Sequence, residues 1–194
     1  MTEKSQTNPS NNTANSGEDT EAVSSLKIDE EQLNAPIDPY RTESLSDLRE
    51  ETLKYFRLAK RSIQIYSENL DPRVLNTRDI EGAVLSFVRS SRKVKVEILI
   101  IDERAVQSLD HRLVKLAQNY TSYLSIKIIP KDFHENPFAF YILDGKYLLY
   151  RTLADRYECE VHQLPSSKVK QVSKYFEDVW GQSDPAIHLR ALFL

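Results

Sequence analysis

The stretch SIQIYSENLDPRVLNTRDIEGAVLSFVRSSRKVKVEILIID, residues 62–102, decides the fold class of this chain. Its first part, 62–68, alternates apolar and polar residues, which is typical of a β-strand. Thr77 can cap the helix that follows, in which apolar residues recur at helical spacing. Residues 94–102 end as a continuous apolar run, which favours a buried central strand. A strand, a helix and a strand in this order predict a βαβ unit with parallel strands.

Outside this unit, helical and strand patterns continue to alternate. The dipeptide Asp144-Gly145 is a strong hairpin signal, so antiparallel strands join the parallel ones. The sequence therefore predicts a single α/β domain with a mixed, mostly parallel central sheet flanked by helices. We expect the apolar end, 189–194, to pack back onto it. The further elements expected are a helix capped by Ser46, a helix over 110–120, strands over 125–130, 138–144, 147–152 and 158–164, and a helix from Pro165.

Composition divides the chain near residue 40. Residues 1–40 hold eight acidic and two basic residues, a net charge of −6, and 1–25 nearly lack large apolar side chains. Such a segment cannot bury enough surface to offset the entropy of ordering, so we predict a disordered acidic N-terminal tail over 1–40. Whether Leu26–Leu33 docks on the domain stays open. Residues 41–194 hold 21 acidic and 24 basic residues, a charge of +3, and form the domain.

Several functional classes are excluded by composition. Cys159 is the single cysteine, so an internal disulfide is excluded and a structural zinc site is not expected. With four glycines and no glycine-rich phosphate loop, nucleotide-binding motifs fail, and we expect no cofactor or metal. No apolar run is long enough to span a bilayer and the N-terminus does not read as a secretory signal, so we expect a cytoplasmic protein. A domain charge of +3 is too small to indicate nucleic-acid binding.

The hairpin region resembles one half of the phospholipase D superfamily fold. The motif of that family is a histidine, any residue, a lysine, four further residues and then Asp-Gly-Lys. A second motif, Gly-Ser-any-Asn, follows later in the family. In this chain FYILDGK, residues 140–146, matches the strand and turn that carry the end of the first motif. Counting back from Asp144, the catalytic histidine and lysine positions fall on Pro137 and Ala139. Proline and alanine can neither attack phosphorus nor stabilise charge on its oxygens. The later motif falls on Arg151, Thr152, Leu153 and Ala154, so the resemblance implies a pseudoenzyme with no catalytic residues.

A closer resemblance is to an uncharacterised family of small bacterial phospholipase D-like domains, mainly from gammaproteobacteria. It covers the chain from Tyr40 onward and rests on three passages: Ser67–Pro72, Asp110–Val114 and Tyr150–Glu158. Relatives are also joined to N-acetyltransferase-like domains. The resemblance implies the fold and brings no established activity.

Candidate ligand-binding residues follow from the rule that α/β folds bind ligands at the carboxyl ends of their strands. We expect Arg151 and Arg156 to hold an anion and His111 and Arg112 to close the site. Ser67, Asn69, Asp102 and Thr152 complete the expected set.

Each candidate also has a structural alternative. Arg151 can instead pair with Asp144, Asp155 or Glu158. The His111-Arg112 pair can begin a helix and satisfy Asp102, while Asp102 can cap the next loop. Asp144 is most simply a turn residue, and Cys159 a non-catalytic thiol.

Three functions stay open. The leading hypothesis is a non-catalytic phospholipase D-like module that binds a phosphate- or carboxylate-bearing ligand or a protein partner. The second is a regulatory interaction domain working with an N-acetyltransferase-type partner. The third is a phosphodiesterase or nuclease that uses His111 or His134 and, because family enzymes pair two half-sites, forms a homodimer.

Overall fold

The structure is a computed structural model, and it describes residues 39–163 and 166–189. The strands are β1 (Tyr40–Thr42), β2 (Ser62–Ser67), β3 (Lys95–Ile100), β4 (Leu124–Ile128), β5 (Ala139–Leu143), β6 (Tyr147–Arg151), β7 (Cys159–His162) and β8 (Asp184–Pro185). The α-helices are α1 (Leu45–Leu58), α2 (Pro72–Leu75), α3 (Arg78–Ser90), α4 (Glu103–Ser108), α5 (Arg112–Asn119) and α6 (Ser167–Gln182). Two 3₁₀ turns are η1 (Lys131–Phe133) and η2 (Ile187–Leu189).

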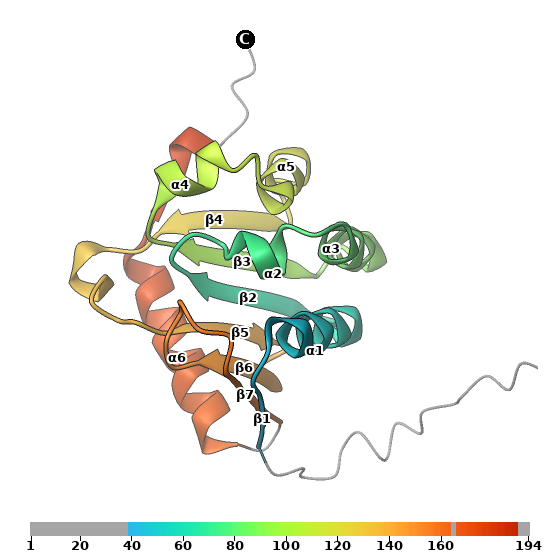
Figure 1. Ribbon diagram of the computed structural model, residues 1–194. Coiled ribbons are helices and arrows are strands. Elements are labelled where there is room, and N and C mark those ends of the chain that lie inside the picture. Colours follow the sequence, from blue (N-terminus) through green and yellow to red (C-terminus); the bar gives the residue numbers. More distant parts are fainter. Residues whose placement is uncertain (1–38, 164–165, 190–194) are drawn as a thin grey trace, which may run out of the picture. The chain divides into compact units, whose positions relative to one another are not determined.

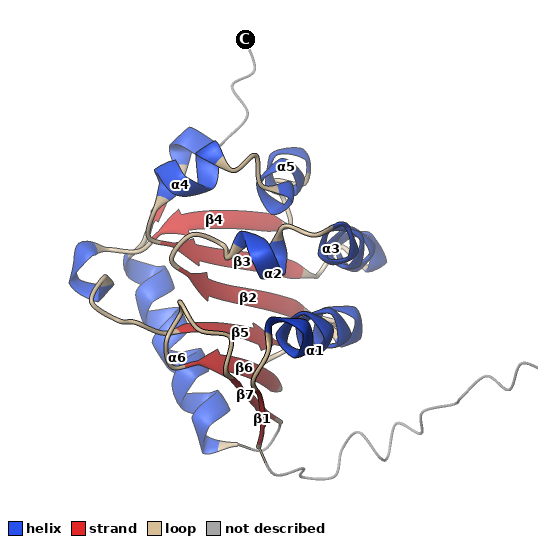
Figure 2. Ribbon diagram, in the orientation of Figure 1, coloured by secondary structure: helices blue, strands red, loops and turns tan. Residues whose placement is uncertain are grey.

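The eight strands form one sheet in the order β1-β7-β6-β5-β2-β3-β4-β8. The predicted α/β domain with a mixed sheet flanked by helices is confirmed (Figure 2). Parallel pairing is limited to β2–β3 and β3–β4, and the other five pairings are antiparallel. The sheet is therefore mostly antiparallel, which corrects the prediction of a mostly parallel sheet. Most of the antiparallel pairs involve the hairpin strands β5 and β6 or the neighbouring strand β7.

Helices cover both faces of the sheet (Figure 1). Because successive residues of a strand point to opposite faces, neighbouring side chains of β2 enter different cores. Ile65 packs in the cluster that also holds Phe56 of α1 and Val84 of α3. Tyr66 packs in the cluster that holds Phe176 of α6. This alternation places α1 and α3 on one face and α6 on the other.

Hydroxyl side chains begin the long helices. Thr77 accepts a hydrogen bond from the Ile80 N–H at 3.3 Å, so the predicted cap of α3 is confirmed. The cap of α1 is Ser44, whose hydroxyl accepts from the Asp47 N–H at 3.1 Å, so the prediction of Ser46 was wrong by two residues. Both caps satisfy amide groups that have no partner within the helix.

Some predictions lie outside the described residues. They concern the predicted tail over 1–40, of which only residues 39 and 40 are described, the docking of Leu26–Leu33, and the packing of 189–194, of which only Leu189 is described. Leu189, the last described residue, is buried. Within the described ranges, no helix has the length and apolar character that crossing a bilayer requires.

Candidate functional site

The predicted site residues gather at one edge of the sheet. The parallel strands β2 and β3 end there at Ser67 and Ile100. Strand β5 runs the other way and begins there at Ala139, which is paired with Arg151 at the end of β6. Pro137 and Ala139, on which the resemblance to the phospholipase D motif placed a histidine and a lysine, therefore lie at the same edge as Arg151.

Arg151 is buried in an ion pair at this edge. Its Nη1 lies 2.5 Å from Oδ2 of Asp71, and the residue is 2% exposed. Asp71 follows β2 and caps α2, where it accepts from the Arg73 N–H. The prediction that Arg151 pairs with Asp144, Asp155 or Glu158 was therefore wrong. A buried guanidinium needs a close carboxylate because desolvating an unpaired charge is costly.

The segment that carries Asp71 has an unusual backbone. Leu70 has φ 60°, and Asp71 has φ 19° and ψ 88°. A leucine in the left-handed region costs of order 1–3 kcal/mol and persists only where its surroundings hold it. Here Asn69 Oδ1 accepts from the Asp71 N–H at 3.2 Å and Leu70 is fully buried. The loop 68–71 is thus held in place by its contacts.

His111 is one of those contacts. Its Nδ1 accepts from the Leu113 N–H and its Nε2 donates to the Leu70 carbonyl, each at 3.2 Å. Burial lowers the pKa of His111 to about 4, so the ring is neutral near pH 7. With 1% exposure and both nitrogens engaged, this imidazole fixes the loop 68–71 to α5 and has no nitrogen free for an anion. The predicted role of His111 at the start of a helix is confirmed, but its second partner is the Leu70 carbonyl and not Asp102.

Arg112 faces α3. Its N–H donates to Asn76 Oδ1 at 3.0 Å, and its Nη1 lies 2.6 Å from Oε2 of Glu81. Arg112 therefore connects α5 to the start of α3. None of these contacts brings it to Arg151.

The remaining candidates surround the loop or face solvent. Asp102 caps α4 by accepting from the Ala105 N–H at 2.9 Å, so the capping alternative is confirmed. Its own N–H donates to the Glu68 carbonyl, which joins the end of β3 to the loop after β2. Ser67 is buried, whereas Thr152 and Arg156 are exposed in the segment after β6.

Two buried polar atoms beside the ion pair have no hydrogen-bond partner among the described residues. They are Nε of Arg151 and the hydroxyl of Tyr141. Burial raises the pKa of Tyr141, the charge of Arg151 lowers it and that of Asp71 raises it, so the hydroxyl lies in the field of the pair. An unsatisfied buried group of this kind calls for an explanation such as an ordered water or a ligand.

Sequence reasoning missed Asp71 and Tyr141. The rule that selected Ser67 and Asn69, polar residues after a strand end, applies equally to Asp71. Tyr141 gave no signal, because an aromatic residue inside an apolar strand is typical of core packing.

The opposite end of β2 holds Asp144. Its Oδ1 accepts from the N–H groups of Arg61 and Ser62 at 2.7 and 2.9 Å, and its Oδ2 accepts from that of Lys60 at 2.9 Å. Its φ of 57° lies in the left-handed region, which Asp tolerates. The expected turn role is confirmed, and the carboxylate also caps the start of β2.

Cys159 is 1% exposed, and burial raises the pKa of its thiol to about 12, so it stays protonated near neutral pH. In 39–163 and 166–189, no group of three or more His, Cys, Asp and Glu side chains could hold a metal ion.

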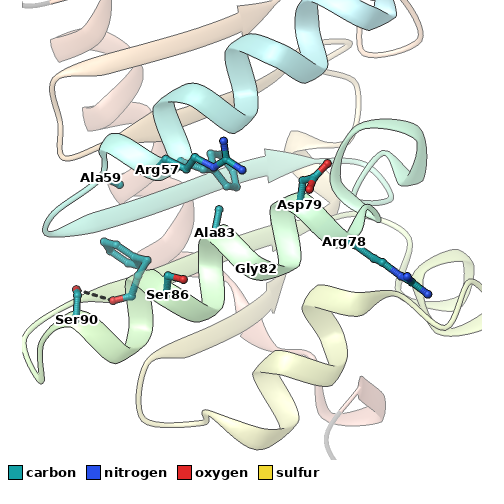
Figure 3. Close-up of a pocket in the computed structure, with 10 residues that line it drawn as sticks. Arg57, Ala59, Arg78, Asp79, Gly82, Ala83, Ser86 and Ser90 are labelled. Carbon is teal, nitrogen blue, oxygen red and sulfur yellow. Dashed lines mark hydrogen bonds between the residues drawn. The ribbon is translucent and has the colours of Figure 1, made fainter. Parts of the chain in front are cut away.

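A hollow of about 430 Å³ lies between α1 and α3 (Figure 3). Small residues line it, including Gly82, Ala83 and Ser86. Arg57 and Asp79 lie along its sides, while the side chain of Arg78 points away. None of the predicted site residues lines this hollow.

Comparison with solved structures identifies the fold. NucT from Helicobacter pylori matches with a TM-score of 0.56 and 14% identity, over 76% of this chain and 99% of that chain. Phosphatidylserine synthase from Haemophilus influenzae Rd KW20 matches with 0.53 and 13%, over 76% and 39%. TrmBL2, described as an archaeal chromatin protein with a novel mode of DNA binding, matches with 0.54 and 14%, over 75% and 53%. This chain thus spans about half of TrmBL2.

The first two neighbours are phospholipase D family members, so the domain has a phospholipase D-like fold. At these identities the likeness is one of fold. A search of curated proteins finds no match. Residues 44–192 match the family described as "Domain of unknown function (DUF7931)", and the chain belongs to that family.

Proposed function

We propose that this protein is a non-catalytic phospholipase D-like module that acts by binding. The observation that carries the proposal is the buried Arg151–Asp71 pair at the sheet edge where Pro137 and Ala139 replace a histidine and a lysine. An arginine remains protonated in proteins and has no lone pair with which to attack phosphorus. The edge therefore holds a guanidinium whose charge Asp71 balances, and neither Pro137 nor Ala139 supplies a nucleophile there.

The enzymatic alternative depends on a histidine elsewhere. His111 has both nitrogens in hydrogen bonds, which leaves His134. His134 is exposed, and its Nε2 lies 2.8 Å from the Ile129 carbonyl. A phosphodiesterase built on His134 would still need a group that stabilises charge on the phosphoryl oxygens. In the family motif the lysine that does this stands two residues after the histidine. The residue two positions after His134 is Asn136.

A hydrolysis assay tests the proposal. Full-length protein is incubated with bis(p-nitrophenyl) phosphate and with single-stranded DNA, beside a His134→Ala variant. We expect both proteins to release product at the rate of buffer alone. A wild-type rate above buffer that the His134→Ala variant loses would overturn the proposal in favour of a rearranged active site and would call for a test of dimerisation.

The ligand class that the geometry supports is a phosphate- or carboxylate-bearing anion at Arg151. Asp71 supplies a carboxylate to that guanidinium from within the chain, and the unpartnered Nε of Arg151 and hydroxyl of Tyr141 are further donors beside it. An external anion has to replace Asp71. Asp71→Asn removes the internal charge and keeps an oxygen that can cap α2.

Thermal melting in phosphate tests this ligand class. We expect phosphate to raise the melting temperature of Asp71→Asn at the lowest concentrations, that of wild type only at higher concentrations because Asp71 competes for Arg151, and that of the matched Asp71→Asn/Arg151→Gln variant not at all. Ligand at 100 times its dissociation constant stabilises by about 2.7 kcal/mol, which melting resolves readily. If a cooperatively melting Asp71→Asn protein does not respond, the anion site is refuted. The binding proposal then passes to a protein partner, with an N-acetyltransferase-type protein as the first to test.

A further inference from the structure

A strongly basic surface lies where the central parallel strands begin. Residues 57–62 and 89–95 hold seven basic residues and no acidic residue, and all seven basic residues are exposed. The two segments are neighbours in space, because Ser62 and Lys95 are register partners and the Lys95 N–H donates to the Arg61 carbonyl at 3.1 Å. We call these two segments the basic surface. It connects the ends of α1 and α3 to the starts of β2 and β3.

The positive charge of the basic surface exceeds what the fold itself requires. Each helix end carries about half a negative charge, so the ends of α1 and α3 together offset about one of the seven cations. The acidic residue Asp144 contacts the surface through its carboxylate, which accepts three N–H groups of residues 60–62. A surface with such an excess of one charge concentrates ligands of the opposite charge. Six of the basic residues form no ion pair within 39–163 and 166–189: Arg57, Arg61, Arg89, Arg92, Lys93 and Lys95.

The hollow between α1 and α3 adjoins the basic surface and is a second, independent observation (Figure 3). Arg57 and Ser90 belong to both features. The exposed Gly82 leaves the space between the helices open, since a Cβ atom there would meet no atom within 4 Å. The hollow is therefore a groove with basic residues at one end and an apolar floor. That floor is formed by buried residues of both helices, namely Phe56, Ala83 and Phe87.

An acidic amphipathic helix complements both features. Such a helix binds a groove by placing its apolar stripe in it, and helix axes approach to 8–10 Å depending on the side chains at the contact. A helix that lies between α1 and α3 would place apolar side chains in the hollow and acidic side chains against the basic surface. A nucleic acid would use the basic surface and leave the apolar floor without a partner, because proteins contact it mostly through phosphate and sugar.

We propose that the groove between α1 and α3 and the basic surface together bind an acidic amphipathic helix of a partner protein. Carboxylates of that helix pair with Arg57, Arg92 and Lys93, and its apolar side chains enter the hollow. This inference goes beyond the proposed function, because the basic surface lies at the start of β2 and the Arg151–Asp71 pair lies beyond its other end. Either binding site can therefore fail without the other.

Fluorescence anisotropy on full-length protein tests the inference with a labelled peptide of glutamate and leucine. The peptide has about 14 residues, which matches the length of α1, and its leucines recur at helical spacing. The test variant is Arg57→Gln/Lys93→Gln. The matched control, Lys170→Gln/Lys174→Gln, removes the same charge from exposed positions of α6. Because each exposed ion pair contributes modestly, we expect the test variant to bind about tenfold more weakly and the control to bind like wild type.

A second variant tests the hollow without removing a charge. Gly82→Leu fills the hollow, and leucine favours a helix more than glycine does, so the melting temperature should not fall. We expect this variant to bind the peptide about tenfold more weakly than wild type.

Three results would overturn the proposal. They are an absence of binding at low salt, equal losses in the test and control variants, and unchanged binding by Gly82→Leu. Equal losses would show attraction to net charge alone, which salt screens. A DNA duplex that binds wild type more tightly than the peptide, and that binds Gly82→Leu equally well, would replace the partner helix by a nucleic acid.

Discussion

The two ends of the central strands use their polar groups differently. At the start of β2, the Asp144 carboxylate accepts three backbone hydrogen bonds from residues 60–62. At the other end, the Asp71 carboxylate is paired with the buried guanidinium of Arg151. The difference teaches that a carboxylate can hold the backbone in place at one end of a sheet and balance a buried charge at the other.

The largest expected effect is at the Arg151 end. Arg151→Met leaves the Asp71 carboxylate, whose side chain is 12% exposed, without its partner. We expect the free energy of unfolding to fall by about 3–5 kcal/mol, as when one member of a buried ion pair is removed. Urea denaturation monitored by circular dichroism measures it.

The control for this prediction is Arg151→Met/Asp71→Asn, in which neither charge remains. We expect the double variant to be more stable than Arg151→Met, because the orphaned charge has gone. Strictly additive losses would mean that the two groups do not interact, and the contrast between the ends would lose its main support.

The next effect concerns the pH dependence of the same end. Burial lowers the pKa of His111 from 6.5 to about 4, so the unfolded chain takes up a proton there that the folded chain refuses. Stability is therefore lost as the pH falls from 6.5 to 4, by about 3 kcal/mol. The matched variant is His111→Asn, which keeps a cap for α5 and does not titrate. Unfolding curves whose difference between these proteins is constant across that range would contradict the assignment.

The smallest expected effect is at the Asp144 end. Asp144→Ala removes the acceptor of three N–H groups and places alanine at φ 57°, and we expect a loss of about 2 kcal/mol. Asp144→Asn keeps one oxygen and tolerates this backbone, so it should cost about half as much. Thermal unfolding of both variants measures the effect. Losses of equal size would show that the carboxylate oxygens do not act as described.

Local signals in the sequence predicted much of this fold. Asp144-Gly145 placed the hairpin of β5 and β6, and Thr77 placed the start of α3. Each signal depends on a few neighbouring residues whose conformations are restricted. Strand β1 gave no such signal, because its three residues are a strand only through pairing with β7, about 120 residues later.

The position of the candidate site could be predicted from the sequence, but the ion-pair partner of Arg151 could not. The rule for strand ends located Ser67, Asn69 and Arg151 at one edge. The partner of Arg151 could not be read from the sequence, since Asp71 lies 80 residues away and the three carboxylates near Arg151 in sequence were the natural alternatives. Which distant groups meet is decided by the order of the strands in the sheet, and the sequence predicted the strands without that order.

The most direct test of the account is whether water reaches the side chain of Arg151. Proton exchange of its Nε–H, followed by nitrogen-15 NMR in wild type and in Asp71→Asn, measures this access. The account predicts slow exchange in wild type without phosphate, and a signal that shifts and saturates as phosphate is added, at lower concentrations in Asp71→Asn than in wild type. Rapid exchange in wild type, or no response to phosphate in the folded variant, would contradict a binding position that Asp71 holds closed.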